Sequence, residues 1–132
     1  MNNCIFCKIV AGEIPSYTVY EDDKTKAFLD IKPVAKGHLL LITKKHYAQF
    51  ENLPSADLAY VFKIAQKIRP VLKESLGAKY VVMTVAGDEI DHFHIQFVPR
   101  RADDGLTNWP PSKLTEDTAE ELVKVLKPKF TI

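Results

Sequence analysis

The sequence has few of the features that mark secreted, membrane or nucleic-acid-binding proteins. It holds 2 cysteines, and its formal net charge is +1, from 18 lysines and arginines against 17 aspartates and glutamates. That balance gives no electrostatic case for binding long nucleic acid or an anionic membrane. No apolar run approaches the roughly 20 residues of a membrane span, and the first residues lack the basic and apolar regions of a signal peptide. We therefore expect a cytoplasmic protein whose partners include no membrane and no long nucleic acid.

The composition is that of an ordinary globular protein. Of the 132 residues, 46% are hydrophobic and 27% are charged. This length suffices for one domain with a hydrophobic core, and the chain contains no repeat, low-complexity stretch or linker. We expect residues 1–132 to form a single domain. A small anionic ligand stays compatible with the charge balance, because it needs only a few local donors.

Apolar periodicity and turn residues predict an α+β protein with a mainly antiparallel five-stranded sheet, one long helix and one C-terminal helix. Leu39–Ile42 is a continuous apolar run, which is typical of a strand buried on both faces. Ser55 and Gly77 are candidate caps of the long helix, and Pro70 should kink or divide it. The expected elements are a short helix at 5–10, strands at 17–22, 25–31 and 38–43, the long helix at 55–76, strands at 80–85 and 90–98, and a helix at 115–127.

The segment 90–98 carries the chemistry of greatest interest. Side chains alternate between the faces of a strand, so His92, His94 and Gln96 should share one face, about 6–7 Å apart. The intervening apolar residues can then pack under the helices. Neutral imidazole is a good nucleophile near pH 7, so the polar row suits attack on phosphorus. The alternative is a solvated strand face that carries two histidines without a catalytic role.

The two cysteines indicate a metal site. Cys4-x-x-Cys7 places two thiolates on one turn, a spacing that zinc sites use repeatedly. Zinc needs two further ligands, for which His46 and His92 are the candidates. A closed Cys2His2 site would be structural and would tie the N-terminus to the catalytic strand. Two alternatives remain, a pair of small buried hydrophobes and a redox pair, which the lack of a surrounding βαβ unit disfavours.

Several distant segments of the chain resemble, in order, the histidine triad (HIT) superfamily, and in particular its small zinc-containing bacterial and archaeal members. The resemblance covers nearly the whole chain and implies a HIT-like fold. The matching segments are Cys4–Pro15, Tyr20–Asp23, Ala27–Ile31, Pro33–His38 and Leu41–Tyr47.

The resemblance implies a role for each matching residue. His94 matches the nucleophile that attacks an α-phosphorus and forms a nucleotidyl-histidine, which water, phosphate or another acceptor resolves. Asp30 matches the acid that binds the ribose hydroxyls. The zinc ligands of the family match Cys4, Cys7, His46 and His92. The apolar base pocket matches Ile5, Phe6, Ile9, Phe28 and Leu29, for which the alternative is plain core.

The chain departs from the hydrolase pattern in three places. Gln96 takes the third catalytic position, as in the His-x-His-x-Gln rows of galactose-1-phosphate uridylyltransferases and certain diadenosine polyphosphate phosphorylases. Asp88 stands in a short loop where a neutral donor is common, and a carboxylate there repels phosphate unless it points away. Asp91 precedes His92, where proline or an aromatic residue is more usual. These departures leave two functions open: a nucleotidyl hydrolase or transferase, and a nucleotide-binding regulatory module with little turnover.

The resemblance also implies a homodimer. Similar proteins pair their sheets across a two-fold axis, with the helix equivalent to 55–76 at the interface. The apolar stripe of this helix, from Leu58 to Leu72, is broader than one small sheet should need.

Overall fold

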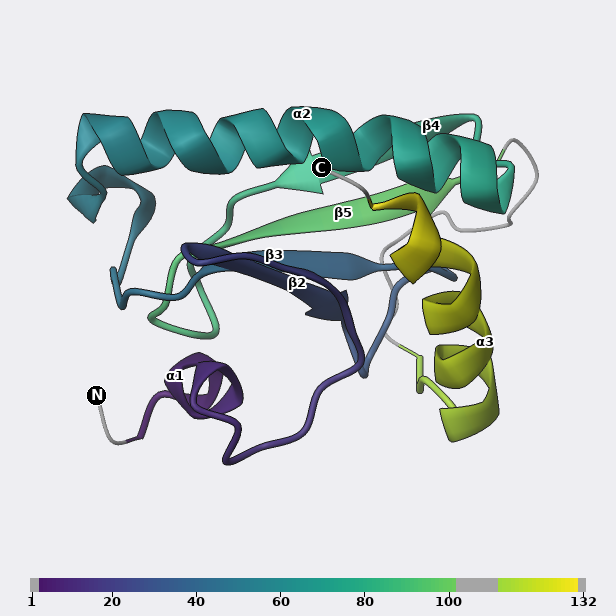
Figure 1. The fold of residues 1–132 in the computed structure, drawn as a ribbon, viewed down its shortest axis with the longest axis horizontal. Coiled ribbons are helices and arrows are strands. Elements are labelled where there is room, and N and C mark those ends of the chain that lie inside the picture. The colour runs from purple at the N-terminus through teal and green to yellow at the C-terminus, as the bar shows by residue number, and fades with distance from the viewer. Residues whose placement is uncertain (1–2, 102–111, 131–132) are drawn as a thin grey trace.

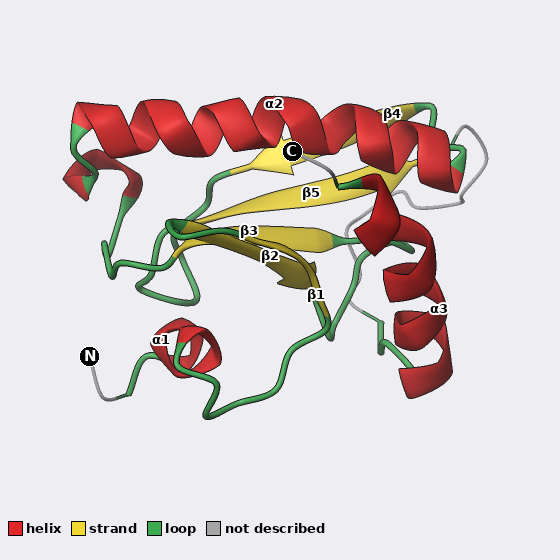
Figure 2. Cartoon of the chain, viewed as in Figure 1, coloured by secondary structure: helices red, strands yellow, loops and turns green. Residues whose placement is uncertain are grey.

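The protein consists of one β-sheet with helices packed against both of its faces (Figures 1 and 2). The computed structural model describes residues 3–101 and 112–130. The strands form a five-stranded antiparallel sheet in the order β1-β2-β3-β5-β4, which confirms the expected class and strand number. The elements are α1 (Ile5–Val10), β1 (Thr18–Glu21), β2 (Thr25–Leu29), β3 (Leu39–Thr43), η1 (Phe50–Asn52), α2 (Ser55–Leu76), β4 (Tyr80–Thr84), β5 (His94–Arg100), α3 (Glu116–Leu126) and η2 (Lys127–Lys129).

The middle of the sheet is buried from both sides, as the apolar run predicted. Leu39 and Leu41 belong to the larger core beneath α2 and α3, whereas Leu40 and Ile42 belong to a smaller core beneath α1. All four side chains are at most 7% exposed. Alternation along β3 therefore gives the sheet one face beneath α2 and α3 and an opposite face beneath α1. None of the helices in the described part of the chain is long and apolar enough to cross a membrane.

The long helix differs from the sequence prediction at its N-cap, and it excludes one of the two outcomes expected at Pro70, a division of the helix. Pro54, not Ser55, occupies the N-cap position, and Ser55 is already the first helical residue. The helix also continues through Pro70 without being divided. Pro70 lies on the exposed face of α2, where water can reach the backbone carbonyl that proline leaves without a donor. Gly77 ends the helix as expected, with the left-handed φ of 63° that glycine adopts without strain.

The strand that carries His94 starts later than predicted. β5 begins at His94 and continues to Arg100, whereas the sequence pattern placed the strand at 90–98. His92 precedes it in a turn, where its backbone N–H donates to the carbonyl of Ile90 at 2.8 Å. The reason is that alternation of polar and apolar residues predicts which side chains share a face of a strand. It does not predict the residue at which hydrogen bonding to the neighbouring strand begins. His92 and His94 thus lie on different backbone elements.

Candidate active site and metal centre

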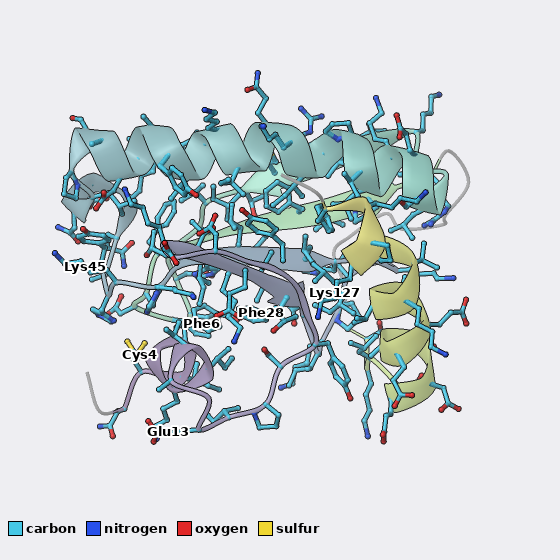
Figure 3. The ribbon with its side chains drawn as sticks, viewed as in Figure 1. Cys4, Phe6, Glu13, Phe28, Lys45 and Lys127 are labelled. Atoms are coloured by element: carbon cyan, nitrogen blue, oxygen red, sulfur yellow. The ribbon has the colours of Figure 1, made fainter. Side chains whose placement is uncertain are left out.

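The apolar wall of the site lies between α1 and the sheet. Phe6 and Phe28 meet edge to face, with ring centroids 5.7 Å apart, and Figure 3 shows both beneath the strands. The cluster around them also contains Ile9, Leu40 and Ile42. Three residues of the predicted base pocket are thus brought together, namely Phe6, Ile9 and Phe28.

The two other predicted pocket residues are placed elsewhere. Leu29 belongs to the larger core, because adjacent residues of a strand point to opposite faces and Phe28 already faces α1. Leu29 therefore does not line the same wall as Phe28. Ile5 is 43% exposed at the start of α1, outside the buried cluster.

A hydrogen bond to the backbone defines which ring nitrogen of His94 carries the proton. Its Nδ1 lies 2.8 Å from the backbone oxygen of His92. A carbonyl oxygen only accepts, so Nδ1 carries the proton and the lone pair of the ring is on Nε2. Phe6 packs edge to face against the imidazole at 5.2 Å between ring centroids. The ring is 7% exposed and lines a cavity of about 90 Å³ that also includes Gln49, Phe50 and Gly87.

The loop before β5 is fastened beside this cavity. The Gln49 Nε2 donates to the Gly87 carbonyl at 3.2 Å and to Asp91 Oδ1 at 2.8 Å. Gly87 has a φ of +70°, and a Cβ there would lie 2.2 Å from the Gln49 Oε1. Asp91, the unusual residue before His92, therefore anchors the loop. Asp88 is exposed and is not among the residues that line the cavity.

The four predicted metal ligands converge, although they come from three distant segments. One ligand atom from each of Cys4, Cys7, His46 and His92 lies within 4.8 Å of the others. The Nδ1 of His92 is 3.3 Å from Cys4 Sγ and 3.6 Å from Cys7 Sγ, and the Nδ1 of His46 is 3.3 Å from Cys7 Sγ. A tetrahedral zinc ion with its usual bond lengths separates sulfur and nitrogen ligands by about 3.5 Å. Figure 3 shows the Cys4 sulfur beside α1.

The protonation pattern of the cluster suits a metal. His92 Nε2 donates to the Thr43 carbonyl at 2.7 Å, which leaves the Nδ1 lone pair facing the thiols. Burial lowers the pKa of His92, so its ring is neutral, as a ligand must be. Cys4 Sγ accepts the backbone N–H of Cys7 at 3.4 Å. Burial, with the Cys4 thiol beside it, raises the pKa of Cys7, and a bound cation would favour the thiolate instead.

His38 is a candidate functional histidine to which the sequence analysis assigned no specific role. It is 3% exposed, and its Nε2 lies 2.8 Å from Gln96 Oε1 and 3.6 Å from Asp30 Oδ2. The signal that could have found it is register: Leu40 pairs with Gln96, and His38 precedes Leu40 by two residues on the same face.

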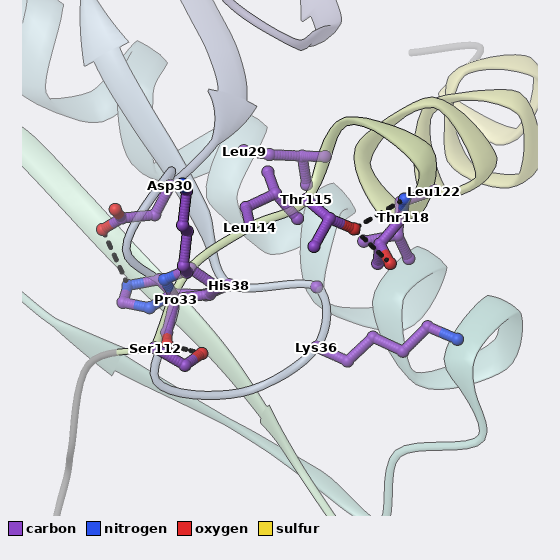
Figure 4. Close-up of a pocket in the computed structure, with 12 residues that line it drawn as sticks. Leu29, Asp30, Pro33, Lys36, His38, Ser112, Leu114, Thr115, Thr118 and Leu122 are labelled. Carbon is purple, nitrogen blue, oxygen red and sulfur yellow. Dashed lines mark hydrogen bonds and ion pairs between the residues drawn. The ribbon is translucent and has the colours of Figure 1, made fainter.

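Asp30, the predicted ribose-binding acid, lies just past the end of β2. Its Oδ1 accepts the backbone N–H of Lys32 at 2.8 Å. Figure 4 shows its carboxylate turned toward the His38 ring, at the edge of a cavity of about 200 Å³ between the β2–β3 loop and the start of α3. The second carboxylate oxygen is thus available on the site side, next to His38.

The family of the chain follows from comparison with known proteins. The model of the HIT domain matches residues 11–103. The chain belongs to the HIT family. An uncharacterized HIT-like protein of Methanocaldococcus jannaschii is 44% identical over 106 residues, which cover 77% of this chain and 82% of that protein. An adenosine 5'-monophosphoramidase of Candida albicans is 37% identical over 142 residues, which cover 93% of each chain.

A solved structure agrees with the fold. The crystal structure of a Zn-bound histidine triad family protein from Mycobacterium smegmatis superposes with a TM-score of 0.84 at 29% identity, covering 97% of this chain and 93% of that one. The chain therefore has the HIT fold. The Candida albicans relative, an adenosine 5'-monophosphoramidase, is a hydrolase. These findings support an enzyme of the HIT type, a nucleotide hydrolase at the level of the family.

Proposed function

We propose that this HIT protein is a nucleotidyl hydrolase or transferase that acts at the α-phosphate through a nucleotidyl-histidine at His94. The observation that carries the proposal is the hydrogen bond from His94 Nδ1–H to the His92 carbonyl, which leaves the lone pair on Nε2 of a ring that lines the cavity. In the first step Nε2 bonds to the α-phosphorus, and the bond to the leaving group breaks with its electron pair. In the second, water or another acceptor bonds to phosphorus and the imidazole is released.

The neighbouring residues bind and orient the nucleotide. Phe6, Ile9 and Phe28 form an apolar wall for the base, and Asp30 accepts hydrogen bonds from the ribose hydroxyls. Gln96 lies on the same face of β5 as His94, since it is two residues along the strand. From there its amide can donate to a non-bridging phosphoryl oxygen.

The cluster of Cys4, Cys7, His46 and His92 would hold a structural zinc ion. With four protein ligands the coordination sphere is closed, so the ion would supply cross-linking and no open position for substrate. These residues would fasten α1, and with it the apolar wall, to the turn that precedes β5.

The identity of Gln96 bears on the leaving group. A third histidine can carry a proton to a departing amine, whereas an amide cannot. We infer that the enzyme prefers donors whose leaving group needs no protonation, such as phosphate or pyrophosphate, over phosphoramidates. Gln96 also motivates the alternative, a nucleotide-binding module with little turnover. An amide in place of the third histidine cannot act as a general acid, so catalysis could have been lost with the substitution.

Replacing Gln96 by histidine should separate these alternatives. We expect Gln96→His to raise phosphoramidate hydrolysis relative to pyrophosphate-leaving donors by roughly ten- to a hundredfold, the range of one hydrogen bond to a charged group. The measurement is kcat/KM for matched adenylyl and uridylyl donors. Gln96→Met, which keeps the length but not the amide, is the control and should lower both activities alike. Unchanged or lower phosphoramidase activity in the histidine variant, at equal nucleotide affinity, would favour the binding module.

We also propose a homodimer formed around α2. Most of the apolar stripe of this helix packs against its own sheet, but Phe62 is 37% exposed. Phe50, 42% exposed, lies beside it with ring centroids 6.2 Å apart. β4, the edge strand of the sheet, carries Tyr80, which is 47% exposed. Light scattering at micromolar concentration should give twice the mass of the chain, and a monomer mass would contradict the proposal.

A further inference from the structure

His38 is a buried titratable residue that the proposed two-step reaction does not use. It lies immediately before β3 and is 3% exposed, and both of its ring nitrogens have partners. Nδ1 is 3.0 Å from the backbone nitrogen of Val34. Nε2 is 2.8 Å from Gln96 Oε1 and 3.6 Å from Asp30 Oδ2. The ring therefore connects the loop after β2, the ribose-binding carboxylate and the amide beside the nucleophile.

These contacts fix every proton in the network. The backbone N–H of Val34 can only donate, so Nδ1 of His38 must accept and carries no proton. The neutral ring then carries its proton on Nε2 and donates to Gln96. The atom of Gln96 that faces it must be the carbonyl oxygen Oε1, because the amide NH2 cannot accept. Burial lowers the pKa of His38, although Asp30 and the Gln96 hydrogen bond act in the opposite direction, and this favours the neutral ring.

The orientation of the Gln96 amide decides what it offers to a substrate. With Oε1 bound to His38, the NH2 group is the end left to face a ligand. The opposite orientation would present a carbonyl oxygen to the negatively charged phosphoryl oxygens, which is repulsive. A free glutamine side chain has a broad terminal torsion and populates both orientations.

We infer that His38 is a positioning residue that locks the Gln96 amide with its NH2 group toward the phosphoryl group attacked by His94. The inference rests on the proposed function of His94. Asp30 assists by attracting the Nε2–H of His38 from the ribose side. The His38 imidazole thus aligns both the carboxylate that binds the ribose and the Gln96 amide that faces the phosphoryl group. His38 acts through Gln96 and touches no reacting atom.

Two substitutions divide the contacts of His38. The shorter side chain of His38→Asn places an oxygen near the position of Nδ1, so it keeps the acceptor for the Val34 N–H but does not reach Gln96. His38→Gln reaches Gln96 with an amide N–H but loses the Nδ1 acceptor. We expect His38→Asn to slow formation of the labelled adduct by about ten- to a hundredfold with nucleotide affinity little changed, and His38→Gln to restore most of the rate. A role confined to the loop would give the opposite order.

A double-mutant cycle tests whether His38 acts through Gln96. In the Gln96→Met background, His38→Asn should change the adduct rate by less than about twofold, because the amide to be oriented is gone. An equal fold-loss in both backgrounds would overturn the inference. Melting temperatures of all variants, measured in parallel, show that rates are compared between folded proteins.

A spectroscopic readout is independent of turnover. Nitrogen-15 spectra of the wild-type protein should show His38 as the neutral Nε2–H tautomer. AMP should shift the side-chain amide signals of Gln96 in the wild type and much less in His38→Asn. An Nδ1–H tautomer, or equal shifts in both proteins, would overturn the inference. A wild type that forms no adduct but passes these spectra would refute the reaction at His94 while leaving the placement of Gln96 by His38 standing.

Discussion

His94→Ala is expected to abolish the covalent nucleotidyl-enzyme and to lower single-turnover nucleotide release by about 10⁴-fold or more. The substitution removes the Nε2 lone pair, and His92 is the one other imidazole among the described residues that line the cavity. The neighbouring imidazole of His92 has its Nε2 bonded to the Thr43 carbonyl and its Nδ1 directed at the thiols. The measurement is retention of α-phosphate label on protein denatured at alkaline pH, where the histidine–phosphorus bond survives.

The variant should stay folded and should still bind nucleotide. It loses one hydrogen bond and the edge contact with Phe6, for which we expect a stability cost of about 1–3 kcal/mol. Because the His94 ring is not in the cysteine–histidine cluster, zinc content measured on the same sample should be unchanged. Persistence of the labelled adduct in His94→Ala would show that another residue is the nucleophile. A wild type that never acquires label, but binds nucleotide, would favour the binding module.

Removal of the metal is expected to have the largest effect on stability. The purified protein should contain about one zinc ion per chain, bound by Cys4, Cys7, His46 and His92. We expect chelation to lower the free energy of unfolding by on the order of 5 kcal/mol and the melting temperature by roughly 15 °C. The cause is that the ion would link residues up to 88 positions apart along the chain, a constraint that the unfolded protein lacks. Elemental analysis and thermal melts with and without chelator test this.

Matched variants separate a metal site from ordinary packing. His46→Asn should lose zinc, whereas His38→Asn, a histidine substitution outside the cluster, should keep it. A double Cys4→Ala, Cys7→Ala variant should melt well below the wild type. If the cysteines were only small buried hydrophobes, that variant would be nearly as stable, and the purified protein would contain reduced cysteines and no metal.

Much of the sheet was predictable because its signals are local. The apolar run in β3 has the composition of a strand covered on both sides, and the structure covers it so. The opposite faces of Phe28 and Leu29 follow from the same alternation, although the family resemblance had placed both in one pocket. Strand ends are set by pairing with distant residues, so the late start of β5 at His94 was not predictable. The continuity of α2 through Pro70 depends on which face is exposed, which is also a tertiary property.

The site was predictable where residue type alone limits the chemistry. Two thiols at short spacing indicated a metal and made His46 and His92 candidate partners, and the family resemblance supplied the same four residues before their geometry was known. The contact between His38 and Gln96 could not, because it needs the register of β3 against β5 and the hydrogen bond to the Val34 N–H. Neither the strand register nor this hydrogen bond can be predicted from the pattern of neighbouring residues in the sequence.

Helix α1 has only six residues, too few to be stable on its own in water. One of its turns supplies Cys7 to the cysteine–histidine cluster, while Phe6 and Ile9 supply the wall of the proposed nucleotide site. A bound metal ion and a bound nucleotide would each require α1 to be ordered. The ligand that binds first would pay the conformational entropy of ordering α1, so the second would bind without that cost. Metal and nucleotide would bind with positive cooperativity although they never touch, and thermodynamic reciprocity requires each to tighten the other by the same factor.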